Sequence, residues 1–270
     1  MPTYLDQIMA RTLLSVYDRK AATPAATLER KAAAHRPRGF KAALRSAATK
    51  GPAIIAELKK ASPSKGLLRE DYKPAAIAKG YERVGAAAIS VLTDEEFFKG
   101  SLDDLTKVSE AVAIPVLRKD FILDSYQILE ARAAGADAVL LIVAAHTDDD
   151  LRQLARTAKE LNLDVLCEVH TREELDHAVD LGCDVIGVNS RDLTTMQMNP
   201  MIHREMVRFL PATVLRVAES GIRTPADVDR LLAVGYDAFL VGEALMRQPD
   251  PAAALSLLMG VDYASESRER

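Results

Sequence analysis

The stretch DVLCEVHTREELDHAVDLGCDVIGVN, residues 164–189, contains one full unit of the pattern that decides the fold. It begins with DVLCEV (164–169), an apolar run of the kind that forms buried strands. The segment REELDHAVDLG (172–182) is amphipathic and ends in Gly182, which readily takes the left-handed conformation that ends a helix. Another apolar run, DVIGVN (184–189), follows at once. The stretch therefore predicts a strand, a covering helix and a second, parallel strand.

The same unit recurs along the chain from residue 53 onward. Eight apolar runs are found, namely AIIAE (53–57), AAISVL (87–92), PVLRK (115–119), DAVLLIV (137–143), DVLCEV (164–169), DVIGVN (184–189), VLRVAES (214–220) and DAFLVG (237–242). Amphipathic segments such as LRQLARTAKELN (151–162) and PADVDRLLAVG (225–235) separate them, and four strands open with the related phrases GAAAIS, GADAVL, GCDVIG and GYDAFL. Eight such repeats favour an α/β fold of the closed (β/α)8 TIM barrel type over an open doubly wound sheet.

The first 48 residues lie outside this repeat and predict an N-terminal helical extension. They hold two amphipathic segments, YLDQIMARTLLSVYDRK (4–20) and GFKAALRSAAT (39–49). Such helices can cover the bottom of the barrel or lie over its active end, and periodicity does not decide between these positions. We expect the barrel itself to span residues 49–260 and the tail, 261–270, to be disordered.

Composition excludes several classes of protein. The chain has 270 residues, 49% of them apolar and 27% charged, which suits a protein with a sizeable core. Its net charge of −4 argues against non-specific nucleic-acid binding. No apolar stretch approaches the roughly 20 residues that span a bilayer, and the first residues do not resemble a signal peptide. Cys167 and Cys183 fall in apolar runs, which predicts reduced, buried thiols in a cytoplasmic protein and no disulfide framework.

Polar and charged residues gather at the ends of the predicted strands. The first strand leads into Glu57 and Lys59, the third ends at Lys119, and the fifth ends near Glu168. Further along the chain, the strand ends carry Asn189, Arg191, Glu219 and Ser220. In a (β/α)8 enzyme the chemistry lies at the carboxyl ends of the strands, and lysines and glutamates that meet there shift one another's pKa values. The sequence therefore predicts an acid–base site.

A phosphate site is predicted after the last two strands. ESGI (219–222) follows the seventh strand and VGEALM (241–246) follows the eighth, so that Gly221 and Gly242 lie in neighbouring loops. Glycine lets the backbone approach an anion closely, and (β/α)8 barrels commonly bind phosphate between these loops.

The remaining polar candidates at the strand ends have less specific patterns. His146 and His170 follow the fourth and fifth strands, where a histidine is either a general base or a loop and capping residue. Alternation along a strand predicts that Cys167 faces the helix layer, and that Arg118 points away from the interior if Lys119 points into it.

Seven motifs together resemble one known family, the indole-3-glycerol-phosphate synthases of tryptophan biosynthesis. They are IIAELKKASPSKG, ISVLTDEEFFKGS, PVLRKDF, ADAVLLIVA, VNSRDL, VAESGI and FLVGEALM. The resemblance covers roughly residues 3–258 and includes the N-terminal extension. It implies a carboxy-lyase that closes an indole ring on an anilino-deoxyribulose phosphate, with loss of carbon dioxide and water.

The resemblance also implies roles for the residues at the strand ends. Lys119 would protonate the substrate ketone and Lys59 would act as a second acid and anion contact. Glu168 and Glu57 would be the bases. Asn189, Arg191, Glu219 and Ser220 would position the substrate carboxylate and hydroxyls. No nicotinamide, metal or pyridoxal cofactor is called for, because acid–base groups suffice for such a step.

The implied substrate-binding set completes the expected site. It consists of Ser62, Pro63, Phe98, Phe121, Leu140, Arg191, Leu193, Ser220, Gly221, Leu240, Gly242 and Glu243. Some family members have a small hydroxylated residue at the position of Glu243, so we expect the Glu243 side chain to turn outward and only backbone to contact the phosphate. A phosphorylated small molecule is the expected partner, with no nucleic acid or membrane and with other tryptophan-pathway enzymes as a further possibility.

Two rival functions are consistent with a phosphate-binding barrel. The isomerase of the preceding pathway step would carry a cysteine at the end of the first strand, where this chain has Glu57 and Lys59. A barrel that only binds a sugar phosphate would keep the glycines and would not need Lys119 opposite Glu168.

Overall fold

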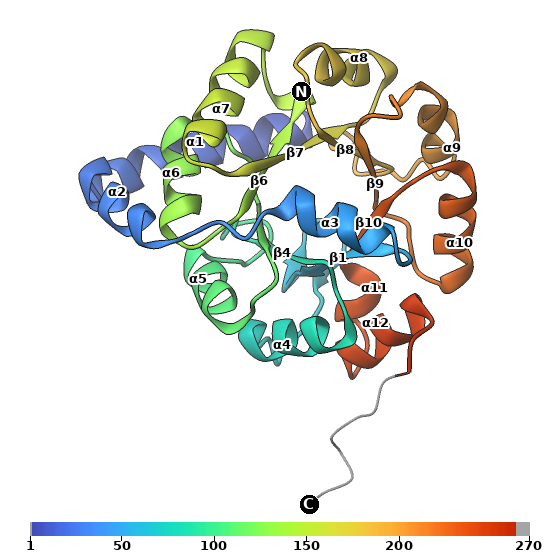
Figure 1. The fold of residues 1–270 in the computed structure, drawn as a ribbon. Helices are drawn as coiled ribbons and strands as arrows, with labels where there is room; N and C mark the ends of the chain where they lie inside the picture. Colours follow the sequence, from blue (N-terminus) through green and yellow to red (C-terminus); the bar gives the residue numbers. More distant parts are fainter. Residues whose placement is uncertain (1, 263–270) are drawn as a thin grey trace, which may run out of the picture.

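A computed structural model describes residues 2–262, in which eight parallel strands close into a barrel (Figure 1). The barrel strands are β1 (Ala53–Leu58), β4 (Ala88–Leu92), β5 (Val116–Lys119), β6 (Ala138–Ile142), β7 (Asp164–Val169), β8 (Val185–Asn189), β9 (Leu215–Glu219) and β10 (Ala238–Val241). Each pairs in parallel with its neighbours, and β10 closes the ring on β1 through the register Ala53–Ala238 to Ala56–Val241. The predicted (β/α)8 fold is confirmed.

Helices alternate with the strands and cover the outside of the barrel. They are α4 (Pro74–Val84), α5 (Leu102–Ala111), α6 (Ser125–Ala133), α7 (Asp148–Glu160), α8 (Arg172–Asp180), α9 (Ile202–Met206), α10 (Pro225–Val234), α11 (Glu243–Met246) and α12 (Pro251–Met259). Short 3-10 turns, η1 (Val143–Ala145) and η2 (Val207–Phe209), follow β6 and α9, and a small hairpin, β2 (Ala61–Ser62) and β3 (Gly66–Leu67), follows β1. None of the helices within residues 2–262 has both the length and the apolar character needed to cross a bilayer.

The barrel strands have two buried faces, and strict alternation separates them. On β1, Ile54, Ala56 and Leu58 belong to the cluster between sheet and helices, whereas Ala53 and Ile55 belong to the cluster inside the barrel. Because successive side chains point to opposite faces, the next inward positions after Ile55 are those of Glu57 and Lys59. The same alternation applies to the other strands, so each charged strand end continues an apolar inward row.

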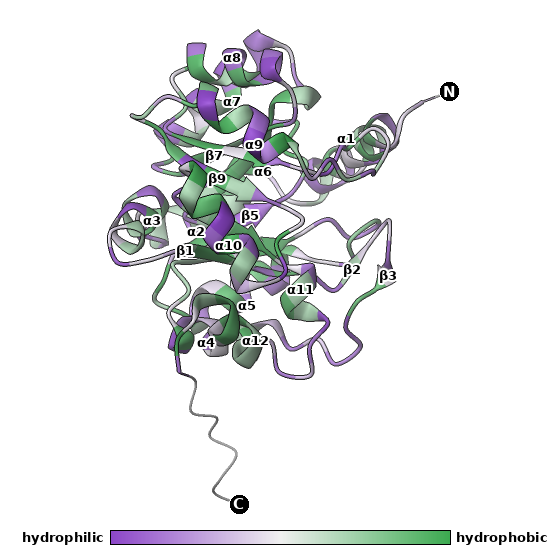
Figure 2. Cartoon of the chain, turned by 90° about the vertical axis from the view of Figure 1, so that its right-hand side faces the viewer, coloured by the Kyte–Doolittle hydropathy of each residue, from purple (hydrophilic) through white to green (hydrophobic). Residues whose placement is uncertain are grey.

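The N-terminal extension covers both ends of the barrel. It forms α1 (Tyr4–Ala22), α2 (Ala25–Ala34) and α3 (Phe40–Ala48). Figure 2, a side view of the barrel, shows α3 at one end and α1 at the other, on the same side as the β2–β3 hairpin. Both predicted positions, bottom and active end, are therefore occupied, by different helices of the extension.

The two end helices are anchored by burial and by hydrogen bonds. Phe40 and Leu44 of α3 are fully buried and join the cluster inside the barrel, and the backbone N–H of Lys41 donates to Asp164 at the start of β7. Leu5 and Ile8 of α1 join the same cluster from the opposite end, next to the partly buried Phe97, Phe98, Leu193 and Met196. Helix α2 packs beside α6, where Leu28 lies against Tyr126. Residues 263–270, most of the tail predicted to be disordered, lie outside the described part of the chain.

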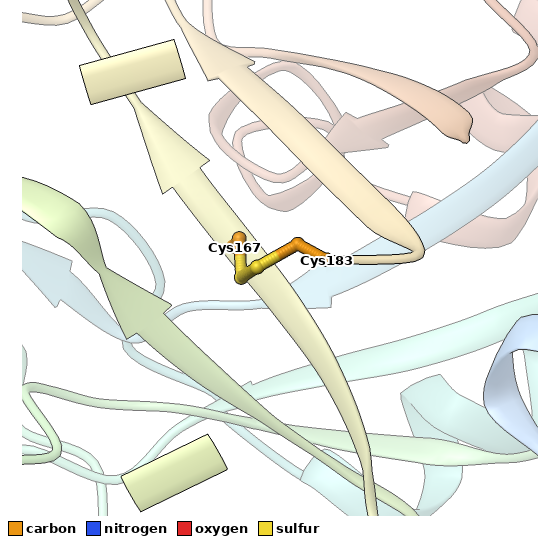
Figure 3. Close-up of a disulfide and its surroundings, with 2 residues drawn as sticks. All are labelled: Cys167 and Cys183. Carbon is orange, nitrogen blue, oxygen red and sulfur yellow. A yellow bond between two sulfur atoms is a disulfide. The ribbon is translucent and has the colours of Figure 1, made fainter. Parts of the chain in front are cut away.

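The prediction of reduced cysteines was wrong, because the structure joins Cys167 and Cys183 in a disulfide (Figure 3). Cys167 does face the helix layer, as predicted, and is fully buried there. Cys183 lies just before β8, the strand next to β7, and the two Cα atoms are 6.6 Å apart, within the range that a disulfide spans. The strand–helix–strand unit brings the two sulfur atoms together, and the amino-acid composition alone does not show that they are neighbours.

Candidate active site

A cavity of about 480 Å³ opens at the carboxyl ends of the strands. Its walls include all six residues predicted to be catalytic, namely Glu57, Lys59, Lys119, Glu168, Asn189 and Glu219. They also include ten of the twelve predicted binding residues, namely Phe98, Phe121, Leu140, Arg191, Leu193, Ser220, Gly221, Leu240, Gly242 and Glu243. Ser62 and Pro63 are not among the lining residues and lie at the β2–β3 hairpin. With Leu92 of β4 also in the wall, the structure gathers residues from all eight barrel strands and their loops around one space.

Lys119 lies between two buried glutamates on the floor of this cavity. Its Nζ is 3.1 Å from Glu168 Oε2 and 3.4 Å from Glu219 Oε2. The lysine side chain is 14% exposed, and each glutamate side chain is 1% exposed. Burial alone would lower the pKa of Lys119, but the surrounding carboxylates, Glu168 first, raise it above its ordinary value. Lys119 is therefore held as an ammonium group, the form that can donate a proton.

The two glutamates that flank Lys119 have opposite proton affinities. Burial would raise the pKa of Glu168, but Lys119 and His170 lower it below its ordinary value. Burial raises the pKa of Glu219 to about 8, because Lys119 compensates only in part and Glu168 adds repulsion. Neither carboxylate oxygen of Glu219 accepts a hydrogen bond from the described residues. Two carboxyl groups with separated pKa values next to one ammonium group are suited to proton transfer.

Glu57 and Lys59 form a second acid–base pair in the wall of the cavity. Lys59 Nζ is 2.6 Å from Glu57 Oε1, and both side chains project inward from the end of β1. Gly242 is what gives Glu57 its space, because a Cβ at residue 242 would lie 2.2 Å from Glu57 Oε1. The inward-facing positions of β1 are apolar along the strand and end in Glu57 and Lys59, so the end of this strand places a carboxylate and an amine in the cavity.

Arginines surround the two glycine loops at one side of the cavity. Arg191 and Arg247 line the cavity beside Gly221 and Gly242, and Glu243 lies between them. Glu243 Oε1 is 3.2 Å from Arg247 Nε, and Glu243 Oε2 is 3.9 Å from Arg191 Nη2. The Glu243 carboxylate is therefore engaged by cations. Because Arg223 lines the cavity as well, three arginines outnumber the one Glu243 carboxylate beside the glycine loops, and this excess of positive charge suits a phosphate group.

Apolar side chains make up another part of the cavity wall. Phe98 and Phe121 meet with ring centroids 6.4 Å apart, and Leu140, Leu193 and Leu240 belong to the same cluster. An aromatic ring would be accommodated between such side chains. Leu92, Ile142, Met198 and Ile222 line the cavity as well and were not predicted.

Polar lining residues that the sequence analysis missed come from loops. They are Lys65, Asp94, Asp120, Arg223, Arg247 and Gln248. Asp94 accepts hydrogen bonds from the backbone N–H groups of Phe97 and Phe98, and burial raises its pKa to about 6. Its place in ISVLTDEEFFKGS, directly after a strand, was the available signal. Arg247 gave no signal beyond its spacing of four residues from Glu243.

The other strand-end candidates lie outside the cavity wall. Arg118 points away from the interior, as predicted, and its guanidinium donates to Asp120, 2.8 Å away. Neither His146 nor His170 lines the cavity, so neither lies where a general base would meet the substrate. His170 instead lies behind Glu168, with its Nε2 atom 3.3 Å from Glu168 Oε1.

Comparison with solved structures shows the fold alone. N-acetylmannosamine-6-phosphate 2-epimerase from Clostridium perfringens superposes with a TM-score of 0.57 at 16% identity, over 72% of this chain and 88% of that chain. Thiamine phosphate pyrophosphorylase from Pyrococcus furiosus gives a TM-score of 0.58 at 19% identity, over 78% of this chain and 95% of that chain.

Comparison of sequences identifies the family. The family model for indole-3-glycerol phosphate synthase matches residues 5–258. The indole-3-glycerol phosphate synthase of Koribacter versatilis is 53% identical over 96% of this chain and 100% of that protein. The one from Burkholderia vietnamiensis is 48% identical over 95% of this chain and 98% of that protein. With Lys119, Glu168 and the two glycine loops in one cavity, this chain belongs to the indole-3-glycerol phosphate synthase family.

Proposed function

We propose that this chain converts 1-(2-carboxyphenylamino)-1-deoxyribulose 5-phosphate to indole-3-glycerol phosphate, releasing carbon dioxide and water. The observation that carries the proposal is the Lys119 ammonium group between two buried glutamates on the cavity floor. Family membership supports the choice of substrate. The substrate has a phosphate, an aromatic carboxylate and a ketone, and the cavity has an arginine rim, an apolar wall and an ammonium group to match them.

Ring closure is the step assigned to Lys119. The aromatic carbon that bears the carboxylate attacks the ketone carbon, and the ketone oxygen takes a proton from Lys119. Positioned general acids of this kind contribute about 10² to 10⁴-fold in rate. Glu168, the ionised neighbour, stabilises the positive charge that develops at the ring nitrogen, and loss of carbon dioxide then restores aromaticity.

Dehydration completes the reaction and uses the second pair. The hydroxyl formed from the ketone leaves as water after protonation by Lys59, and a glutamate, Glu57 or Glu168, accepts the proton that the five-membered ring loses. Asn189, Arg191, Glu219 and Ser220 position the substrate carboxylate and hydroxyls. The backbone at Gly221 and Gly242 holds the phosphate, with Arg191 and Arg247 adding charge.

A direct assay tests this function. Purified protein, mixed with the anilino-deoxyribulose phosphate, is expected to generate the fluorescence of an indole product, with indole-3-glycerol phosphate identified by mass spectrometry. A correctly folded protein, checked by circular dichroism, that formed no such product would overturn the proposal.

Three further predictions rest on this function. We propose a cytoplasmic location, although the Cys167–Cys183 disulfide removes the support that reduced thiols would have given. Other enzymes of tryptophan biosynthesis are the proposed protein partners. Residues 1–48 and 49–260 are the proposed extension and catalytic barrel.

A further inference from the structure

His170 is a buried histidine that touches the active site from outside the cavity. It follows β7 directly, and its ring lies between two carboxylates. Nδ1 is 3.1 Å from Glu174 Oε2, and Nε2 is 3.3 Å from Glu168 Oε1. The side chain is only 10% exposed, so water does not screen these contacts strongly.

We propose that His170 is a positioning residue of this enzyme, held by Glu174 as an imidazolium that keeps the Glu168 carboxylate ionised and turned toward Lys119. This inference rests on the proposed function, and it assigns His170 no contact with the substrate.

The two neighbouring carboxylates favour the charged form of the ring. A neutral imidazole has one N–H donor and one acceptor nitrogen, and an acceptor facing a carboxylate would be repelled. Nδ1 of His170 lies at hydrogen-bond distance from Glu174, and Nε2 makes a longer ion-pair contact with Glu168, so a ring with both nitrogens protonated satisfies both contacts. In agreement, burial would lower the pKa of His170, but Glu168 and Glu174 raise it to about 10.

Glu174 holds His170 through the first turn of α8. Its Oε2 atom accepts from the backbone N–H of His170 at 2.7 Å as well as from the ring. The backbone N–H of Glu174 donates to Thr171, the capping residue of this helix. The first turn of α8 therefore holds the Glu174 carboxylate in place, and this carboxylate holds the imidazole ring of His170.

The result is a row of alternating charges that runs into the cavity. Glu174, His170, Glu168 and Lys119 follow one another, with each neighbouring pair 3.1 to 3.3 Å apart. Glu168 uses one oxygen for His170 and the other for Lys119. Two cations on one carboxylate fix its rotation and stabilise its ionised form, which the buried site would otherwise penalise.

The experiment compares His170→Gln with a matched control, His177→Gln. His177 lies on α8, the helix that carries Glu174, and is 3.3 Å from Asp148, but the His177 and Asp148 side chains are both more than half exposed and neither lines the cavity. Glutamine keeps a donor near the Nε2 position and loses the charge. His170→Gln is expected to lower kcat by about 10- to 100-fold, because the Glu168 carboxylate would no longer be held in the position that stabilises the transition state. KM should stay within about twofold, and the acidic limb of the kcat/KM profile should move to higher pH.

Two further measurements keep the test decisive. Glu174→Gln should change kcat and the acidic limb in the same direction as His170→Gln, and His177→Gln should change neither. Nitrogen NMR of the wild-type protein should show His170 protonated at both ring nitrogens at pH 7, which tests the pairing even if His170→Gln does not fold.

The proposal is overturned if His170→Gln keeps wild-type kcat, if its loss is confined to KM with an unmoved acidic limb, or if the NMR signal shows a neutral ring. An inactive wild-type enzyme would instead contradict the proposed function, while the NMR result would still report on the ring.

Discussion

Gly187 of β8 is a position at which one added methyl group would displace an active-site carboxylate. A Cβ on residue 187 would lie 2.0 Å from Glu219 Oε1, 3.1 Å from Glu219 Cδ and 3.2 Å from Leu166 Cδ1. Residue 187 lies in a regular strand, in register with Glu168, so alanine meets no backbone obstacle there. The carboxylate end of Glu219 must therefore move by about 1 Å or more, and a displacement of that size costs about 10²-fold in rate.

The stability cost of Gly187→Ala should be small by comparison. Glu219 accepts no hydrogen bond from the described residues, and its ion-pair contact with Lys119 is long, at 3.4 Å, so rotation of its flexible end weakens only this contact. We expect a loss of about 1 kcal/mol in the free energy of unfolding, the low end of the range for added methyl groups in a core. The measurements are steady-state turnover by product fluorescence and urea unfolding by circular dichroism.

A glycine far from the cavity provides the control. A Cβ at Gly80 on α4 would come within 3.0 Å of Ala252 Cβ, a crowded position in the helix layer. Gly80→Ala should change stability and leave kcat at the wild-type value. If Gly187→Ala kept kcat within about twofold of wild type, the position of Glu219 would not matter for catalysis and the reasoning would be refuted.

Three other perturbations have defined outcomes. Burial raises the pKa of Glu219 to about 8, so between about pH 4.3 and 8 the folded protein binds more protons than the unfolded chain, and its stability falls as pH rises through that window. Glu219→Gln should reduce this fall, measured by urea unfolding at several pH values. An unchanged dependence of stability on pH would contradict the assignment. Deleting residues 2–22 should leave a folded barrel with a raised KM. Deleting residues 2–48 also removes the buried Phe40 and Leu44 of α3 from the bottom of the barrel and should sharply lower the melting temperature. Equal melting temperatures of the two shortened proteins would show that α3 is dispensable. Unfolded, unreduced protein should show no reactive thiol, and titration of both Cys167 and Cys183 would exclude the disulfide.

Alternation and repetition made much of the site predictable from the sequence. Lys119 and Glu168 each follow an inward-facing leucine by two positions, so an assignment of the strands also assigns their direction. The carboxyl ends of all barrel strands meet at one end, which explains why residues 62 positions apart, Glu57 and Lys119, share a cavity.

The parts that could not be predicted depend on distances between separate elements. Nothing in DVIGVN shows that Gly187 makes room for a glutamate on the next strand. Amphipathic periodicity shows that α1 and α3 bury one face, but not which end of the barrel each face meets. Likewise, the spacing of Cys167 and Cys183 does not show that a strand–helix–strand unit places their side chains together.

The central claim is that Lys119 donates the proton that drives indole ring closure. Lys119→Met keeps an apolar stem and removes the ammonium group, and single-turnover measurements of carbon dioxide release and product fluorescence test it directly. We predict equal amounts of both products from the wild-type enzyme, and from Lys119→Met a loss of about 10² to 10⁴-fold in the rate of both. The substrate should still raise the melting temperature of the variant, because the arginine rim is intact. Product formation by Lys119→Met within about tenfold of the wild-type rate would contradict the claim.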